Sequence, residues 1–241
     1  MLHSPIYQWK SPKESGYDRR KAIIEDFAEI PQQGRIYAEI KGFMMKNVLV
    51  TGYRAHELNI FGQKHPGIAY IQKAVTAKLV QLAEEGLEWV ISPGQYGVDL
   101  WACEAAIGLK RDYPDLKVAI ITAFEHPEEN WKEDKKEYYN RILQGIDYYG
   151  AVSRQPYSGP WQFRARDDLL FRKTDGILLV YDEETGEGSS ARFYKERALK
   201  LQQEEGYGFL SISTEDIQSL ADEETSGWDD AGGPEIGGGF T

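Results

Sequence analysis

A glycine-bearing turn within residues 92–106 has the residue types that can bind an anion. A short apolar stretch at residues 87–91 precedes it and predicts a strand. Gly94 and Gly97 allow backbone conformations closed to other residues, and they let a ligand approach the main chain. Asp99 stands where an amphipathic helix is expected to begin, and it can cap that helix. Such a turn suits a phosphate at a positive helix end, although an ordinary strand–helix connection has the same pattern.

Three residues that suit a ligand follow the first strongly apolar strand, which is expected at residues 46–51. Gly52 lets the backbone turn, Tyr53 comes next, and Arg54 offers a planar fork of donors for phosphate or carboxylate. The polar loop beyond them contains His56, which could be an acid–base group or an ordinary surface histidine.

Aromatic and basic residues gather at a proline-rich loop, residues 156–161, and at the helix expected after it. Trp161, Arg164 and Arg166 together could stack on a base and hold a phosphate. The alternative is that the aromatic rings cover the sheet edge and that the arginines pair with acidic side chains.

A second strand–glycine–helix pattern begins with a strand at residues 176–181. Gly188, Ser189 and Ser190 can donate to an anion at the start of the next helix. Asp182 follows the strand and could accept from ribose hydroxyls or from a base edge. A capping or solvated role for Asp182 is the alternative.

Strands and helices alternate through residues 46–212, which predicts an α/β fold, a Rossmann-like three-layer sandwich with a mostly parallel sheet. The continuous apolar run at residues 117–122 is typical of a parallel strand covered on both faces. Ligands bind such sheets at the carboxyl ends of the strands, so the candidate turns should line one nucleotide-sized cleft. The GxGxxG and GxxxxGK[ST] motifs are missing, which argues against an ordinary dehydrogenase or P-loop ATPase.

The composition excludes several other classes. The 241 residues carry a formal net charge of -11, which argues against non-specific binding to nucleic acid or to an anionic membrane. Cys103 is the only cysteine, so no disulfide forms within the chain, and we interpret it as a small buried residue rather than a nucleophile. No apolar run is long enough to cross a bilayer, and no signal peptide is evident. We therefore expect a cytoplasmic protein.

The two ends of the chain differ from its middle. Residues 1–44 are polar, with prolines, and predict an N-terminal extension with at most one helix. Met44 and Met45 directly precede the first strand, so the natural start could lie there. We expect one domain at residues 45–218 and a flexible, acidic and glycine-rich tail at residues 219–241.

Five strings in the sequence resemble the YpsA family of bacterial proteins, in the right order: TGYRAHEL, GVDLWACEAA, ENWKE, PYSGPWQFRARDD and TDGILLVYDEETGEGSS. That family belongs to the SLOG superfamily, which also holds the DNA-processing protein DprA and the LOG phosphoribohydrolases. The resemblance covers about residues 45–220. One departure is Asp167, where the family usually has asparagine, and it puts Asp167 in doubt as a ligand contact.

The resemblance implies a Rossmann-like fold that binds a nucleotide or a nucleotide derivative, such as an ADP-ribose-like or NAD-like ligand. Carried onto matching positions, the binding groups would be Gly52, Arg54, Gly94, Gly97, Asp99, Trp161, Arg164, Gly188 and Ser189. LOG enzymes carry a PGGxGTxxE motif whose glutamate serves N-glycosidic cleavage, whereas this chain has Arg192 at that place. The difference weakens any transfer of LOG chemistry.

We expect first a sensing or regulatory module that binds such a ligand without turning it over, with no metal site and no other cofactor. The alternative is a nucleoside-phosphate hydrolase, with a catalytic carboxylate from Glu57, Asp99, Glu104 or Asp182. A DprA-like binder of single-stranded DNA is more distant, because the chain is acidic. The domain could also form a homo-oligomer. Replacing Gly97 by valine should abolish ligand binding and leave the fold largely intact.

Overall fold

The computed structural model describes residues 44–183, 186 and 188–229, with side chains as far as residue 222. All of these residues belong to one unit of the chain, Gln32–Thr241. The N-terminal extension and the end of the expected tail lie outside the described residues. The hypotheses made for them, including a start at Met44 or Met45, therefore stay predictions.

One six-stranded sheet forms the centre of the unit, in the order β4-β3-β2-β1-β5-β6. Every described strand pair is parallel. The chain adds strands on one side of β1 and then crosses to the other side, so the strand order reverses between β1 and β5. The predicted α/β fold, Rossmann-like with a parallel sheet, is thus confirmed. The strands are β1 (Asn47–Gly52), β2 (Trp89–Ser92), β3 (Lys117–Thr122), β4 (Tyr148–Ala151), β5 (Gly176–Val180) and β6 (Gly208–Ile212).

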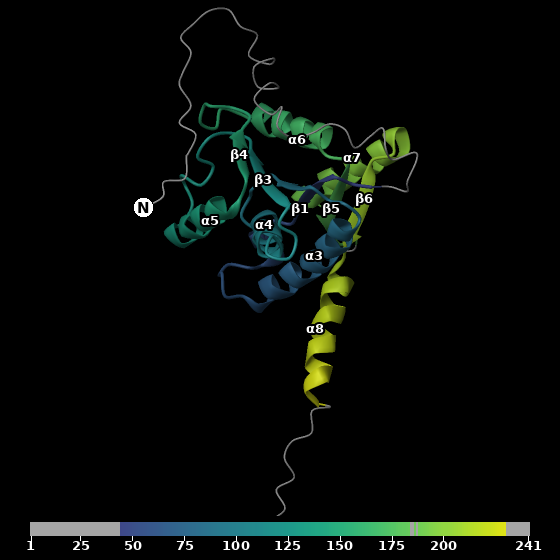
Figure 1. Cartoon of the computed structure of the whole chain (residues 1–241). Coiled ribbons are helices and arrows are strands. Elements are labelled where there is room, and N and C mark those ends of the chain that lie inside the picture. Colours follow the sequence, from purple (N-terminus) through teal and green to yellow (C-terminus); the bar gives the residue numbers. More distant parts are fainter. Residues whose placement is uncertain (1–43, 184–185, 187, 230–241) are drawn as a thin grey trace, which may run out of the picture. The chain divides into compact units, whose positions relative to one another are not determined.

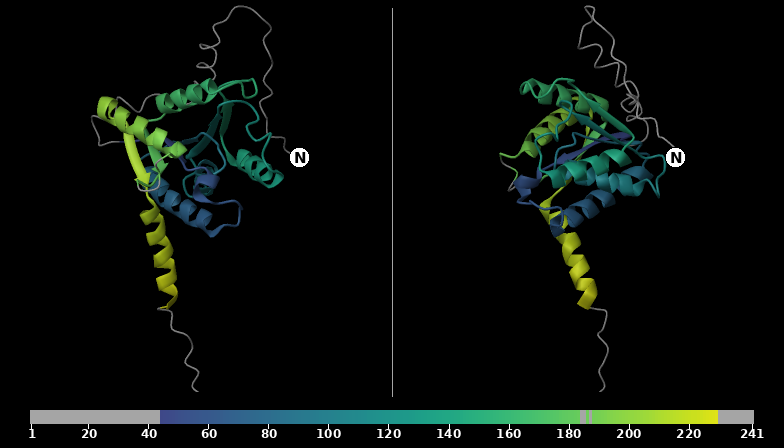
Figure 2. Two further views of the ribbon diagram at one scale, coloured as in Figure 1. Left: turned by 180° about the vertical axis from the view of Figure 1, so that it is seen from behind. Right: turned by 90° about the vertical axis from the view of Figure 1, so that its left-hand side faces the viewer.

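Helices cover both faces of this sheet, with α3, α4 and α5 on one face and α6 and α7 on the other (Figure 1). Figure 2 shows the same layers from two further sides. Right-handed crossovers explain the division, because connections that run from β1 towards β4 and connections that run back fall on opposite faces. The helices are α3 (Pro66–Glu84), α4 (Val98–Leu109), α5 (Glu133–Gly145), α6 (Trp161–Lys173), α7 (Ser190–Glu205) and α8 (Thr214–Asp229), and a short 3-10 helix, η1 (Ala55–Leu58), follows β1.

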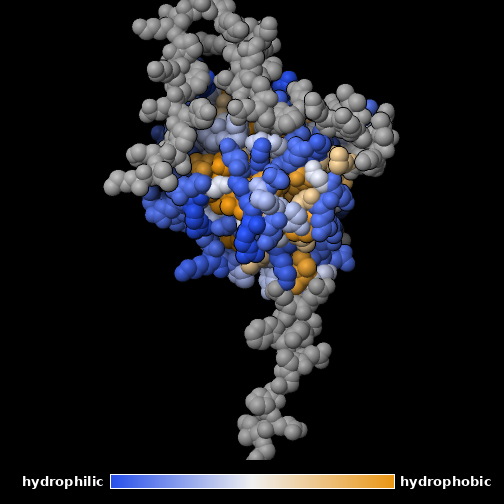
Figure 3. Space-filling model, viewed as in Figure 1, coloured by the Kyte–Doolittle hydropathy of each residue, from blue (hydrophilic) through white to orange (hydrophobic). Residues whose placement is uncertain are grey.

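The core lies between the sheet and its two helical layers. All residues of β1, β2 and β5 are buried, as expected for central parallel strands, whereas the edge strand β4 is mostly half-buried. Hydrophilic residues dominate the described surface in the view of Figure 3, with hydrophobic residues between them. Among the described residues, no helix is long and apolar enough to cross a membrane.

The last described helix differs from the prediction. The sequence pattern placed an irregular tail from residue 219 onward, but α8 continues to Asp229 and packs against α3. Ser213 and Asp216 start this helix: the Ser213 hydroxyl accepts from the Asp216 N–H at 3.1 Å, and the Asp216 carboxylate accepts from the Ser213 N–H at 2.7 Å. This reciprocal capping was visible in the sequence as a serine three residues before an aspartate.

Gly52 has a different role from the one predicted. It is the last residue of β1 and pairs with Val180 of β5, and it is not among the glycines with a positive φ angle. A Cβ atom on Gly52 would lie 2.7 Å from the Val180 carbonyl oxygen and 3.0 Å from Val98 Cγ1. Gly52 therefore permits β5 and α4 to approach the end of β1, and a turn is not the reason for it.

We predict that Gly52→Ala lowers the free energy of unfolding by about 1–3 kcal/mol, because the added methyl group overpacks this junction. Chemical denaturation followed by circular dichroism would measure the change. The matched control is Gly62→Ala, since a Cβ atom there meets no atom within 4 Å. Equal stabilities of the two variants would contradict the role given to Gly52.

Candidate functional site

The carboxyl ends of the strands bring most of the predicted site residues to one edge of the sheet, called the carboxyl edge below. In open α/β sheets, ligands collect at this edge where the strand order reverses. Here the reversal falls between β1 and β5. The exit loop of β1, the turn after β2 and the segment after β5 all reach this edge.

The Gly94–Gly97 turn is fastened to the exit loop of β1. Gly97 forms an isolated antiparallel bridge with Arg54, the Ala55 N–H donates to the Tyr96 carbonyl at 3.1 Å, and the Val98 N–H donates to the Tyr53 carbonyl at 3.0 Å. The two glycines adopt φ angles of 73° and 144°. This is the left-handed side of backbone space, which glycine enters without strain.

The contacts of Gly97 correct one expectation. A Cβ atom on Gly97 would lie 2.6 Å from both the Ala55 nitrogen and the Tyr53 carbonyl oxygen, and 2.8 Å from Arg54 Cα. All of these atoms belong to the backbone and cannot move aside cheaply. Gly97→Val would therefore disturb the fold itself, and the expectation that it removes only ligand binding is wrong.

Asp99 lies under this turn and is only 4% exposed. Its carboxylate accepts from the Thr51 hydroxyl at 2.7 Å and from the Gln95 N–H at 3.0 Å. It does not cap α4, because Gly97 holds the N-cap position and Asp99 lies in the first turn. Burial raises the pKa of Asp99 to about 6, although the two hydrogen bonds and the charges of nearby arginines act in the opposite direction.

Arg54 is the exposed cation of this region. Its Nε atom donates to the Gln95 side-chain oxygen at 2.9 Å, so its guanidinium stands beside the Gly94–Gly97 turn. Gln95 is neutral and orients the guanidinium, while the negative charges that Arg54 interacts with are those of Glu57 and Asp99. An anion at the turn would thus meet a positive charge that is already in place.

Two tyrosines fill the position between β1 and β5. The rings of Tyr53 and Tyr181 stack with centroids 6.1 Å apart, and both residues are buried. The Tyr53 hydroxyl accepts from the Asp182 N–H at 2.9 Å and donates to the Asp182 carbonyl at 3.3 Å. Tyr53 thus holds the chain after β5 in place, a structural role that the sequence did not reveal.

The start of α7 is also engaged by the protein. Ser189 caps the helix by accepting from the Arg192 N–H at 3.3 Å, and its hydroxyl donates to the Gly186 carbonyl at 2.7 Å. Glu57, from η1, reaches the same helix end and accepts from the Ser190 N–H at 2.9 Å. Gly188 lies just before Ser189 with a φ angle of 85°.

Partial burial acts to raise the pKa of Glu57, but hydrogen bonds from Ser190 and Arg54 outweigh it and lower the pKa. The Glu57 side chain is therefore an anion, held at the helix end where the sequence predicted an anionic ligand. Sequence reasoning placed Glu57 among the possible catalytic carboxylates and missed this contact.

Gln162 organises the loop before α6, and sequence reasoning missed it as well. It is fully buried, at 0% exposure. Its amide nitrogen donates to Ser153 Oγ at 3.0 Å and to the Pro156 carbonyl at 3.1 Å, and its oxygen accepts from the Ser158 N–H at 2.7 Å. The loop held in this way leaves Trp161 45% exposed at the start of α6.

The two arginines of α6 have separate roles. Arg164 is exposed, one turn from the helix start. Arg166 is 3% exposed and donates to the Asp167 carboxylate at 2.7 Å and to the Tyr194 hydroxyl at 2.9 Å. The alternative reading of this region, in which an arginine pairs with an acid, is thus correct for Arg166. Asp167 is the acidic partner of Arg166 in this buried ion pair.

Two other candidates lie away from the carboxyl edge or are inert. Glu104 lies in the helical layer, where its carboxylate accepts from Gln72 of α3 at 2.7 Å and from Tyr138 of α5 at 2.8 Å. This position, away from the carboxyl edge, does not support the prediction that Glu104 is a catalytic candidate. Cys103 is fully buried, and burial raises the pKa of its thiol to about 12, in keeping with the predicted packing role.

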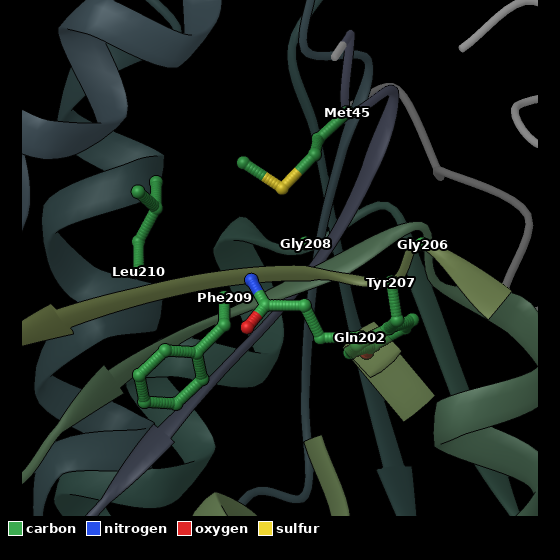
Figure 4. A pocket seen from close by; sticks show the side chains of 7 residues that line it. All are labelled: Met45, Gln202, Gly206, Tyr207, Gly208, Phe209 and Leu210. Carbon is green, nitrogen blue, oxygen red and sulfur yellow. The ribbon is translucent and has the colours of Figure 1, made fainter. Parts of the chain in front are cut away.

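Two described pockets lie elsewhere on the domain. One, of about 320 Å³, runs along the edge strand β6 beside Met45 and Gln202 (Figure 4). The other, of about 330 Å³, lies over α3 and α4 beside Glu104. Neither is the nucleotide-sized cleft expected at the carboxyl edge. Among the residues that the structure describes, no group of three or more histidine, cysteine or acidic side chains could hold a metal ion.

The buried carboxyl group of Asp99 predicts a pH dependence of stability. Its pKa is raised from 3.8 to about 6 in the folded state, so the folded protein binds a proton more tightly than the unfolded chain. The stability gained from this proton is complete below pH 3.8 and is lost as the pH rises through 6. The loss of this proton should therefore lower the free energy of unfolding by about 0.8 kcal/mol as the pH rises from 5.5 to 7.5.

The measurement is chemical denaturation of the natural protein and of Asp99→Asn at both pH values. Asparagine can accept from the Gln95 N–H and donate to the Thr51 hydroxyl, so the variant keeps both contacts without the charge. The natural protein should lose stability relative to the variant as the pH rises. The same pH slope in both proteins would show that Asp99 does not titrate in this range.

Comparison with known proteins supports the family suggested by the sequence strings. A family model named YpsA, described as the YspA SLOG family, matches residues 48–217. A UPF0398 protein of Brevibacillus brevis is 46% identical over 181 residues, which cover 75% of this chain and 95% of that protein. The UPF0398 protein YpsA of Bacillus subtilis is 41% identical over 181 residues, which cover 75% of this chain and 99% of that protein.

A solved structure of DNA processing protein A from Helicobacter pylori, described for its binding of single-stranded DNA, is similar at 17% identity with a TM-score of 0.39. The match covers 76% of this chain and 82% of that chain. A likeness this low carries no inference about ligands. The family model, over residues 48–217, spans the sheet from β1 to β6 and the carboxyl edge. On these matches, the chain belongs to the YpsA family of SLOG proteins.

Proposed function

We propose that the protein binds a nucleotide or a nucleotide derivative of the ADP-ribose or NAD kind at the carboxyl edge, as a sensing or regulatory module. The observation that carries the proposal is the exposed guanidinium of Arg54, held by Gln95 beside the Gly94–Gly97 turn at the start of α4. A cation, a glycine turn and a helix N-terminus at one place suit a phosphate.

Trp161 and Arg164 supply a second element of the proposed site. Trp161 is 45% exposed although it is a large apolar residue, and Arg164 lies on the same first turn of α6. Arg166, two residues after Arg164, is buried, and its charge is one of the influences that act to lower the pKa of Asp99. We propose that a base stacks on Trp161 while a phosphate contacts Arg54.

Three of the four candidate carboxylates, all except the half-buried Asp182, support binding more than turnover. Glu57 is engaged by Ser190 and Arg54, Asp99 by Thr51 and Gln95, and Glu104 lies in the helical layer. Hydrolysis needs a carboxylate that can reach the substrate or a water molecule. The hydrolase remains the second candidate because the pKa of Asp99, about 6, suits a group that exchanges protons near neutral pH.

We predict that calorimetry with ADP-ribose, NAD, AMP and cyclic nucleotides finds at least one ligand. Arg54→Ala should weaken its binding roughly 10- to 100-fold, because a charge-assisted contact to phosphate is lost. The matched control is Arg111→Ala, since the Arg111 side chain is 86% exposed and pairs with its neighbour Asp112. A folded protein that binds nothing in this panel would contradict the proposed function.

The same samples separate the two candidate functions. Mass spectrometry after long incubation should recover the nucleotide unchanged if the protein only binds it. Release of a free base that stops in Asp99→Asn would establish the hydrolase instead. A gel shift with single-stranded DNA at low salt should be negative, given the net charge of -11.

A further inference from the structure

The start of α7 is occupied by a carboxylate of the protein itself. Glu57 Oε1 accepts from the Ser190 N–H at 2.9 Å, and Oε2 accepts from the Ser190 hydroxyl at 3.0 Å and from the Arg54 N–H at 2.6 Å. Two of the three donors belong to Ser190, which lies 133 residues from Glu57 along the chain. Glu57 thus ties the exit loop of β1 to the helix after β5.

Two tyrosine rings lie between the ends of the strands that lead to Glu57 and to Ser190. Tyr53 and Tyr181 stack between the ends of β1 and β5 and are 6% and 7% exposed. The Tyr53 hydroxyl holds the main chain of Asp182. Tyr181 also packs against the chain that leads to α7, because a Cβ atom on Gly186 would lie 2.2 Å from Tyr181 Cε2. The segments that carry Glu57 and Ser190 are therefore held to each other by more than the Glu57 carboxylate.

Electrostatics then decides what can bind beside Glu57. Its pKa is lowered by the hydrogen bonds from Ser190 and Arg54, so the side chain stays charged at neutral pH. A phosphate at the same helix end would have to take the Ser190 donors from Glu57, and would also face its negative charge. A ligand group that donates hydrogen bonds meets no such barrier.

We propose that Glu57 is a specificity-determining residue that excludes phosphate groups from the start of α7. The proposal rests on the proposed function for its ligand and goes beyond it. The phosphates of a ligand are confined to Arg54 and the Gly94–Gly97 turn, and the part that faces Glu57 must carry hydrogen-bond donors. A carboxylate can accept about four hydrogen bonds, and three are used here, so a ribose hydroxyl could provide the next.

The test compares the natural protein with Glu57→Gln and Glu57→Ala. The first variant removes the charge and keeps the size, and the second also opens the space. Calorimetric titration with inorganic pyrophosphate should show binding at least tenfold tighter in both variants than in the natural protein. In amide NMR spectra, the Ser190 N–H should shift during the titration in the variants alone.

Glu88→Gln is the matched control. Glu88 pairs with Lys46 at 2.6 Å next to the amino end of β2, so this substitution changes the net charge equally but far from the carboxyl edge along the strand. It should leave pyrophosphate binding at the level of the natural protein. Equal binding by Glu57→Gln, Glu57→Ala and Glu88→Gln would overturn the proposal, as would a gain without a shift of the Ser190 amide.

The outcomes for the two proposals are separable. A natural protein that binds no nucleotide, together with variants that gain pyrophosphate, would contradict the proposed function and support the role of Glu57. Nucleotide binding by the natural protein, without any gain in the variants, would do the opposite. Circular dichroism of both variants verifies that a missing gain is not a loss of folding.

Discussion

The structure of the carboxyl edge depends on the close approach of two backbone segments, the exit loop of β1 and the Gly94–Gly97 turn. Tyr53 and Ala55 exchange hydrogen bonds with the turn that ends at Gly97, and this approach leaves no room for a side chain at position 97. The carboxylate of Asp99 closes the same junction from below through Thr51 and Gln95. Because this junction fixes the loop after β1, it also fixes Arg54, which lies in that loop, and Glu57, which lies in the short helix η1 that follows. The positions of Arg54 and Glu57 on this edge follow from it.

The carboxyl edge thereby divides into two parts of different character. On the side of β5 the protein satisfies its own groups, with tyrosine rings, a capping serine and an internal carboxylate. On the side of α4 and α6 it leaves an arginine and a tryptophan exposed. Tryptophan and arginine are among the side chains that most often dominate the free energy of binding. The asymmetry favours a ligand that lies across the second part.

The sequence was sufficient for the fold because its strands are short, apolar and separated by helices. β1, β3 and β5 coincide closely with the predicted runs, since a central parallel strand must be apolar on both faces. β4 has no such apolar run, because Tyr148–Ala151 is an edge strand with a mixed pattern. α8 was missed although its capping pair was present, because the acidic composition of its second half suggested a flexible tail.

The sequence predicted which positions belong to the candidate site, but not which residues contact one another there. Glycine turns and helix starts are local features, so Gly94, Gly97 and Ser189 could be found from the sequence. Ser190, a partner of Glu57, and Asp182, the partner of Tyr53, lie more than a hundred residues away from them, and no local pattern indicates these contacts. Gln162 had no signal either, since a polar residue in the first turn of a helix is usually exposed.

The separation of Glu57 from Ser190 also has a consequence for the newly made chain. A contact between residues 133 positions apart closes one of the longest loops in the domain, and the entropy of closing it must be met by the surrounding sheet. While the chain is being synthesised, β1 and its exit loop are made before α7. During that interval Glu57 has no helix end to bind, and this part of the edge is complete only once β5 and α7 have joined the sheet. The selectivity proposed for Glu57 therefore depends on the folded domain and is absent from any shorter segment of the chain.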